Sequence, residues 1–147
     1  KKKKMAIFNG TDLILTVSPS SGGSNAKLMH STSCSLSINV DTIDVSTKDS
    51  AGFRDIIGGQ KSFSLSADGL MDFQGVGADT EPDELFAQMM ARTAVTFVFG
   101  LASPASGDYT YSGSGFITSL EMTGGVEDAP TYSVTIEGSD ALTQNSI

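Results

Sequence analysis

The chain has 147 residues, which suits one domain with one continuous core. Four of its nine basic residues are Lys1 to Lys4, which we interpret as an expression addition ahead of Met5. Without them five cations face 17 acids, so the formal charge is −12, and so acidic a body argues against direct binding to nucleic acid or anionic membranes.

Targeting signals are not expected either. The apolar run after Met5 is broken at "NGTD", which argues against a secretory signal. The longest apolar stretch, residues 94–102, is far shorter than the ~20 residues of a membrane span. Cys34 is the only cysteine, so no intrachain disulfide can form. We expect a soluble protein made in the cytoplasm.

The first half of the chain predicts strands separated by one long loop. Alternation of apolar and polar residues covers 12–17 and, after the flexible turn "SPSSGGSNA", returns over 27–41 and continues through "IDVST" (43–47) beyond a bend. Residues 48–60 are too irregular for a strand and too rich in glycine for a stable helix. A long ordered loop is therefore expected over about 47–61, with room for one helical turn. Alternation resumes over 61–73.

One helix is predicted over about 80–92. Thr80 is the expected cap, acidic residues fill the first turn, and Pro82 lies where its missing N–H costs nothing. An apolar stripe at helical spacing should face the core; it consists of Leu85, Phe86, Met89 and Met90.

The remaining segments complete a mainly β fold. Residues 93–101 predict a buried strand, 109–123 predict one or two strands interrupted by glycines, and 131–138 predict the last strand. Residues 139–147 are expected to form a C-terminal arm. The sum is a single domain over 5–138, a β-sandwich or barrel of seven or eight strands with one flanking α-helix.

Motifs for catalysis are missing from this sequence. His30 and Cys34 share the strand parity of Leu36, Ile38 and Val40, so both are expected to point into the core, and no third group orients them as a nucleophile pair. The acidic pairs do not have the spacing of a calcium loop, and there is no phosphate loop or nucleophile elbow. We expect no enzyme, no catalytic residues, no metal and no cofactor, and place the function in surfaces.

The order of several motifs resembles the major tail tube proteins of long-tailed bacteriophages. The likeness is concentrated in "IDVSTKDSAGFRDIIGGQKSFSLSADGL" (residues 43–70), with an aromatic residue after Gly52, a glycine pair at 58–59 and a strand reading "SFSLSADG". It extends to "GTDLILTV" near the start and "TYSVTIEGS" near the end, so it covers most of the body in order.

The resemblance implies a structural virion protein that forms stacked hexameric rings, and so a tail tube through which DNA passes without specific binding. In that family the subunits contribute strands to a shared inner barrel, while long loops and terminal arms join adjacent rings. The implied partners are the chain itself and the tape-measure, tail terminator and baseplate proteins, with assembly in the host cytoplasm. The resemblance does not separate contractile from non-contractile tails.

Four segments have one face of small polar or acidic residues, and such a face suits a channel lumen. Lys and Arg would hold phosphate, whereas Ser, Thr and a few carboxylates would not. The alternative is that these are ordinary solvent faces of a sandwich. The candidate lumen-facing residues are Ser33, Ser35, Ser37, Asn39, Asp41, Ser62, Ser64, Ser66, Asp68, Ser119, Glu121, Ser133, Thr135 and Glu137.

The long loop is the candidate contact between subunits. Three of the five cations outside the N-terminal run lie in or beside it, and apolar residues in the loop could anchor on a neighbour. A self-packed surface loop is the alternative. The candidate residues are Lys48, Phe53, Arg54, Asp55, Ile56, Ile57 and Lys61.

A monomeric β-sandwich that binds or decorates a virion is the alternative function. Such a module would need an exposed aromatic platform. The chain has no tryptophan and only three tyrosines, which disfavours this alternative.

Overall fold

A computed structural model describes residues 9–18, 26–28, 30–72 and 79–147. The predictions for Lys1 to Lys4, the turn at 19–25 and Phe73 lie outside these residues. Within them, one antiparallel sheet has the strand order β2-β1-β5-β6-β7-β4-β3, and the mainly β fold with one α-helix is confirmed. The elements are η1 (Gly10–Asp12), β1 (Leu13–Val17), β2 (Ala26–Lys27), β3 (Ser31–Asp44), β4 (Ile56–Leu70), α1 (Pro82–Ala91), β5 (Val95–Leu101), β6 (Tyr109–Thr123) and β7 (Thr131–Ser146).

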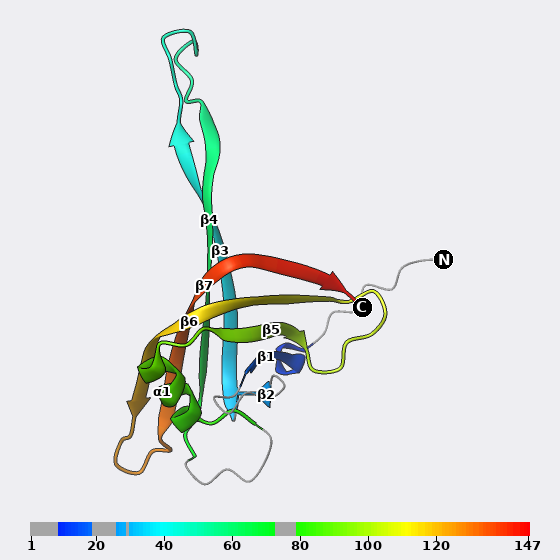
Figure 1. Ribbon diagram of the computed structural model, residues 1–147, viewed down its shortest axis with the longest axis vertical. Helices are drawn as coiled ribbons and strands as arrows, with labels where there is room; N and C mark the ends of the chain where they lie inside the picture. The colour runs from blue at the N-terminus through cyan, green and yellow to red at the C-terminus, as the bar shows by residue number, and fades with distance from the viewer. Residues whose placement is uncertain (1–8, 19–25, 29, 73–78) are drawn as a thin grey trace.

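Two long strands fold this single sheet into two layers (Figure 1). The first half of β6 pairs with β5 up to Gly115, and its second half continues beyond β5. The first half of β7 pairs with β4, whereas residues 139–146 pair with the start of β6. The result is a four-stranded layer, in the order β6-β7-β4-β3, and a five-stranded layer, in the order β2-β1-β5-β6-β7. We use these two names below.

A pair of glycines lies where the sheet turns from one layer to the other. Gly115 and Gly138 are opposite each other in the β6–β7 ladder. A Cβ atom on Gly138 would clash with the ring of Phe63, and one on Gly115 would clash with the carbonyl oxygen of Glu137. Just beyond, Asp140 has a φ of 64°, beside an irregularity in the register. The glycines that interrupt the β6 pattern therefore allow the sheet to bend.

The core fills the space between the two layers. Leu65 and Ile136 reach it from the four-stranded layer, and Leu15 and Val95 reach it from the five-stranded layer. Phe63 and Phe97 meet across the space with ring centroids 5.8 Å apart. Because apolar side chains alternate with polar ones along each strand, each layer has one buried face.

Helix α1 begins one residue later than the sequence predicts. The cap is Glu81, which exchanges hydrogen bonds with Glu84 in a capping box, and not Thr80. Thr80 is fully buried and its hydroxyl donates to the carbonyl oxygen of Val17 at 3.1 Å. The Gln88 amide donates to the carbonyl oxygen of Ser18 at 2.6 Å, so these two side chains fasten the helix to the end of β1.

The predicted apolar stripe of α1 is only half correct. Leu85 is fully buried and Met89 packs against the core, as expected. Phe86 and Met90 are 48% and 59% exposed, because the helix turns these two away from the sheet. Gln88 is buried in their place.

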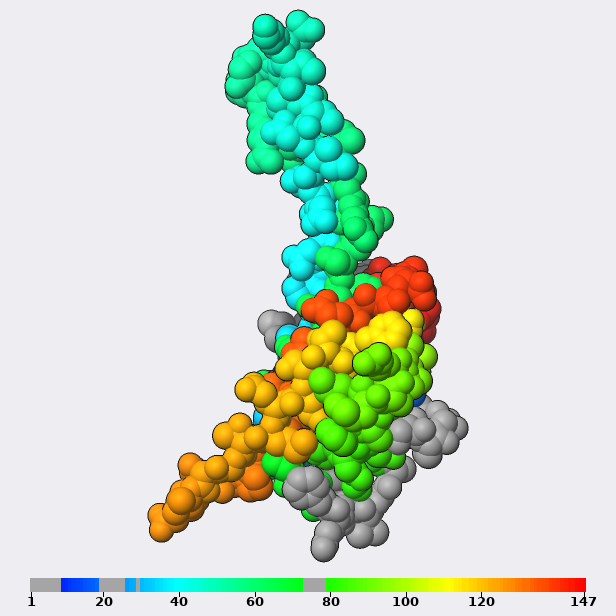
Figure 2. Space-filling model, turned by 60° about the vertical axis from the view of Figure 1, so that its left-hand side comes forward, coloured from blue at the N-terminus to red at the C-terminus, as the bar shows by residue number. Residues whose placement is uncertain are grey.

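The predicted loop over 47–61 is much shorter in the structure, because β4 already begins at Ile56. Strands β3 and β4 run side by side beyond the rest of the sheet and project from the body (Figures 1 and 2). At the base, Val40 faces Lys61 and Thr42 faces Gly58, so the register shifts at Asp41. We name residues 41–60 the projecting hairpin. Its connection, 45–55, contains turns and no helical turn.

Two further expectations are wrong. The C-terminal arm over 139–147 is instead a strand to Ser146, paired with β6 from Tyr109 to Ser112. His30 does not point into the core: it is exposed at the start of β3, with Nε2 3.9 Å from Asp72 Oδ2. Cys34 is half-buried as its parity suggests, and its thiol donates to the Leu13 carbonyl oxygen at 3.5 Å.

No helix in the described part of the chain is long and apolar enough to cross a membrane.

Candidate functional site

The register of the four-stranded layer brings the predicted lumen residues onto one continuous face. One row across the strands contains Ser33, Asp68, Ser133 and Glu121, and the next contains Ser35, Ser66, Thr135 and Ser119. A third contains Ser37, Ser64 and Glu137, and Asn39 faces Ser62 above it. Asp41 lies past these rows, at the register shift. We name these rows the polar face; their assignment to a lumen stays a prediction.

Hydroxyl groups on the polar face bind one another. The hydroxyls of Ser35 and Ser66 are 2.6 Å apart across β3 and β4, and the Ser33 hydroxyl donates to Asp68 Oδ2 at 2.9 Å. No lysine or arginine occurs in the rows, and the charged members are Asp68, Glu121 and Glu137. The face therefore consists of short polar side chains with a few negative charges. The opposite side of the same strands faces the core, except at Ile38 and Val40, which are about half-exposed.

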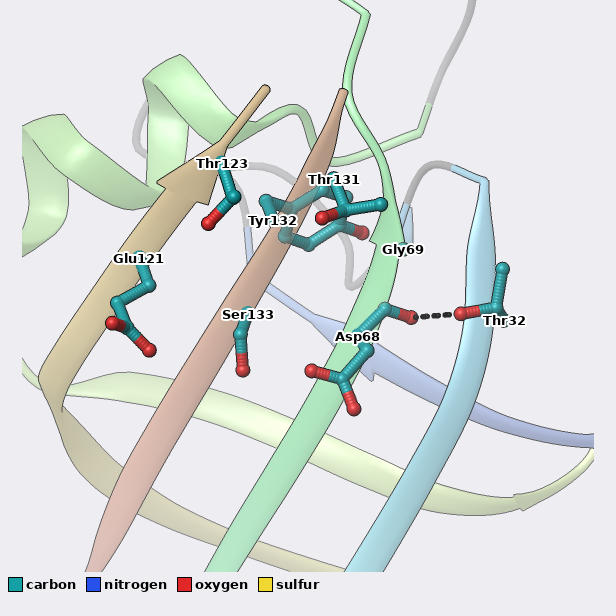
Figure 3. Close-up of a pocket in the computed structure, with 8 residues that line it drawn as sticks. All are labelled: Thr32, Asp68, Gly69, Glu121, Thr123, Thr131, Tyr132 and Ser133. Atoms are coloured by element: carbon teal, nitrogen blue, oxygen red, sulfur yellow. Dashed lines mark hydrogen bonds between the residues drawn. The ribbon is translucent and has the colours of Figure 1, made fainter. Parts of the chain in front are cut away.

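A shallow hollow of about 240 Å³ lies at one end of the polar face (Figure 3). Asp68 and Glu121 stand on β4 and β6, and Ser133 lies between them on β7. Beneath them Tyr132 is buried. Burial, and to a lesser extent the negative charge of Asp68, raises the pKa of Tyr132 to about 12. Among the described residues no three His, Cys, Asp or Glu side chains are grouped to hold a metal ion. The polar side chains that line the hollow carry hydroxyl and carboxylate oxygens.

The four-stranded layer ends in two edges that the described chain leaves without a partner strand. On one side β3 pairs only with β4. On the other side the ladder between β5 and β6 stops at Gly115, so residues 116–123 of β6 pair only with β7. Backbone groups on such edges are available to another strand.

Apolar side chains of the projecting hairpin have no core to enter. Phe53 is 80% exposed, and Ile43, Ile56 and Ile57 are each about half-exposed. The sequence pattern found three of these four, and the structure groups them on one protruding element (Figure 2). Clustered exposed apolar side chains on a soluble domain commonly mark a binding surface.

The predicted loop over 47–61 holds three cations, Lys48, Arg54 and Lys61, against Asp49 and Asp55, whereas the projecting hairpin itself is acidic. Residues 41–60 contain four aspartates against Lys48 and Arg54, and Lys61 lies beyond the register shift at the base. Arg54 Nε is 3.4 Å from Asp44 Oδ2, so this charge is partly satisfied inside the hairpin. The Ser46 amide and hydroxyl hold the pKa of Asp44 below its ordinary value. The Asp55 amide and carbonyl bind Ser46, which gives Asp55 a structural role in the turn.

Several exposed apolar residues were missed because their pattern matches that of core residues. Ile38 and Val40 share the parity of Leu36 yet are 54% and 51% exposed; they lie beyond the point, Ser64 opposite Glu137, at which β4 stops pairing with β7. Val126 is 95% exposed at the tip of a second hairpin, between β6 and β7. A glycine pair before Val126 was the only local signal of that tip.

Comparisons with solved structures place this architecture among tail tubes. A chain from the tail of an empty gene transfer agent particle, solved with C6 symmetry, is 23% identical, with a TM-score of 0.78 over 95% of this chain and 100% of that chain. The SPP1 tail tube protein is 13% identical, with a TM-score of 0.74 over 96% and 80%. The sheath/tube terminator of an extracellular contractile injection system is 18% identical, with a TM-score of 0.65 over 97% and 99%. These likenesses establish the fold.

The family follows from the sequence itself. Residues 7–144 match the family described as Phage tail tube protein. The chain therefore belongs to the phage tail tube protein family. A search of curated proteins gave no match.

Proposed function

We propose that this protein forms six-membered rings that stack into a tail tube for DNA, and that it acts through geometry and electrostatics without catalysis. The observation that carries the proposal is the combination of a lysine- and arginine-free polar face with two unpaired edges on the same four-stranded layer. The sixfold symmetry is proposed by analogy with the gene transfer agent tail, which was solved with C6 symmetry.

The two edges fit a ring because their strands run in opposite directions. Strands β3, β4, β7 and β6 alternate in direction across the layer. When β3 of one copy lies beside β6 of the next, the new pair is therefore antiparallel, like every other pair in the sheet. The layer can thus repeat around a ring and remove its own edges.

The size of the resulting barrel suits a DNA duplex. Six copies of four strands give about 24 strands, and at ~4.8 Å spacing and ~40° tilt the backbone diameter is about 48 Å. Subtracting ~5 Å of side chain from each wall leaves about 38 Å, which exceeds the ~20 Å of a duplex and leaves room for water. With the polar face inward, DNA would meet hydroxyls and carboxylates that do not retain phosphate.

The projecting hairpin is proposed to contact a neighbouring ring. Its apolar side chains are exposed in the single chain, and its length carries them well clear of the body (Figure 1). Burial of Phe53 and Ile57 against a second copy would supply the anchoring contacts of a stacked interface. The ends of such a tube would need terminator and baseplate proteins, and a tape-measure protein would occupy it during assembly.

The test of assembly is electron microscopy of the purified protein. Rings or tubes with sixfold symmetry are expected, whereas small featureless particles over a range of concentrations would favour the monomeric decoration module. The test of the lumen is the double variant Ser35→Lys with Ser64→Lys, which would add about a dozen cations per ring and slow DNA by phosphate contact.

The control for the lumen test is Ser→Thr at the same two positions, which keeps the hydroxyls and favours a strand. Tails of both variants should look normal, and only the lysine variant should lose genome ejection and infectivity. Ejection at the normal rate from the lysine variant would show that the polar face is an ordinary solvent face.

A further inference from the structure

Exposed apolar residues of α1 and of β3 lie on the same side of the four-stranded layer. They lie at its two opposite edges, beside β6 and on β3. Phe86 and Met90 are 48% and 59% exposed on α1, which packs beside β6. Ile38 and Val40 are 54% and 51% exposed on β3, on the side away from the polar face. In the single chain both pairs stay about half-exposed, although Ile38 lies opposite Phe63. Both pairs are therefore unexplained by the fold alone.

The geometry points to α1 as a clamp between subunits: we propose that Phe86 and Met90 of one copy cover Ile38 and Val40 of the adjacent copy in the ring. The inference rests on the proposed ring, in which β3 of one copy lies beside β6 of the next. That contact brings the two ends of the layer together. The helix of one copy then lies over the junction, on the outside of the barrel.

Barrel tilt brings the two pairs to the same height. Four strands at ~4.8 Å, tilted by ~40°, displace equivalent residues of adjacent copies by roughly four to five residues along the strand. The right-handed coiling of sheet strands sets the direction. Seen from outside the proposed barrel, a row perpendicular to strands of this tilt falls from β6 toward β3 and would continue to a lower point on the next copy.

This displacement gives a definite register at the junction. Without tilt, Ser35 would be level with Ser119, because these two residues share a row of the layer. With tilt, Asn39 takes that place, so Ile38 comes opposite Leu120 of the neighbour and Val40 comes beside the irregularity between Ile117 and Ser119. Because α1 packs against β6, this register brings the exposed apolar side chains of the two copies together.

The occupant of the exposed α1 surface is therefore a second copy of this chain. The chemistry agrees: two partly exposed aliphatic residues meet one phenylalanine and one methionine, and no charged residue is among the four. Burying all four removes apolar surface from water at the same seam that pairs the backbone edges. The clamp would also hide the junction from solvent on the outside of the tube.

Cross-linking tests the contact directly. In a Cys34→Ser background, which removes the only cysteine, Val40→Cys and Met90→Cys are introduced together and the assembled protein is treated with a short bis-maleimide. A ladder of products up to six copies is expected on a denaturing gel. Either cysteine alone should give no ladder.

A second cysteine pair distinguishes failure of the clamp from failure of the ring. Asn39→Cys with Ser119→Cys reports the proposed β3–β6 junction on the polar face. A ladder from this pair without one from Val40 and Met90 would overturn the clamp and leave the ring intact. Absence of both ladders, with no rings in electron micrographs, would overturn the proposed function as well.

An assembly measurement gives the energetic test. Phe86→Ser with Met90→Ser should leave the melting temperature of the monomer unchanged, because both side chains are already exposed, and should raise the concentration needed for rings at least tenfold. The control is Ile147→Ser, which removes an apolar side chain of matched exposure, 48%, at the end of the other layer. Ring formation by the double variant at the control's concentration would overturn the clamp.

Discussion

The lower and upper halves of the β3–β4 pair have similar apolar content and opposite environments. In the body, Leu65 and Ala67 are 1% exposed, because β7, β5 and β1 cover them. In the projecting hairpin, Ile43 and Ile57 are both 51% exposed on the same two strands. The difference shows that apolar alternation specifies a strand but does not specify whether another element packs against its apolar face. In the body this chain buries its own apolar side chains, and in the hairpin it leaves them exposed.

The largest contrast is expected from truncating one apolar residue in each half of β4. Leu65→Ala should lower the free energy of unfolding by about 2–5 kcal/mol, because it leaves a cavity in the core. Ile57→Ala should change it by less than about 0.5 kcal/mol, since the side chain is half-exposed, yet should impair ring stacking. Denaturant unfolding and electron microscopy measure the two effects. Equal losses of stability would show that the hairpin has a core of its own.

A matched pair of glycine substitutions sharpens the same comparison. Gly138→Ala should cost about 1–3 kcal/mol, because the new methyl group meets the ring of Phe63. Gly58→Ala in the hairpin meets only Val40 Cγ1, at an ordinary 4.0 Å. It should be neutral or stabilising by about 0.5 kcal/mol, since alanine is favoured over glycine in a strand. Thermal unfolding of both variants checks this, and a neutral Gly138→Ala would contradict the role assigned to the bend.

Alkaline pH should act on the body through Tyr132. Its pKa rises from 10.0 in the unfolded chain to about 12 in the folded one. The native state therefore favours the protonated phenol, and this contribution to stability is complete below pH 10 and is lost as pH rises toward 12. Tyr132→Phe should flatten that part of the stability profile. An unchanged alkaline limb in the variant would assign the loss to other groups.

Acid should act on the hairpin through Asp44, and its effect should be the smallest and the most local. The folded pKa of Asp44 is lowered by Ser46, so the contact is complete above the ordinary carboxyl pKa and is lost as pH falls through the folded value. The protection of the Ser46 amide, measured as its exchange rate relative to the intrinsic rate at each pH, should fall in acid while global stability does not follow it. In the Asp44→Asn variant, the protection of the Ser46 amide should no longer change with the titration of residue 44.

The sequence predicted the polar face and most boundaries of the elements, including β6 at 109–123, but misplaced the start of β4 and the end of β7. Parity alone assigned Ser35, Ser66, Thr135 and Ser119 to polar sides of their strands, and pairing then aligned them. Parity is a local property, so it needs no knowledge of the partner strand.

What the sequence missed depended on distant contacts. Residues 139–146 look like a polar arm because only Leu142 packs against the core, and their strand forms by pairing with the start of β6. Ile56 to Gln60 looked like a loop because glycines hide a strand that pairs with β3. Phe86 and Met90 satisfied the helical period, yet α1 is oriented by bonds from Thr80 and Gln88 to the end of β1.

The two open edges of the four-stranded layer also bear on how a ring would assemble in time. A row of joined copies has one junction fewer than it has members, and it keeps one unpaired edge at each end until the last copy closes it. The last copy therefore forms two junctions, while the entropy lost is that of ordering only one copy. Partial rings should be scarce at equilibrium, and growth should show a lag followed by rapid completion. The arrangement that hides every edge in the finished ring would also make its formation cooperative.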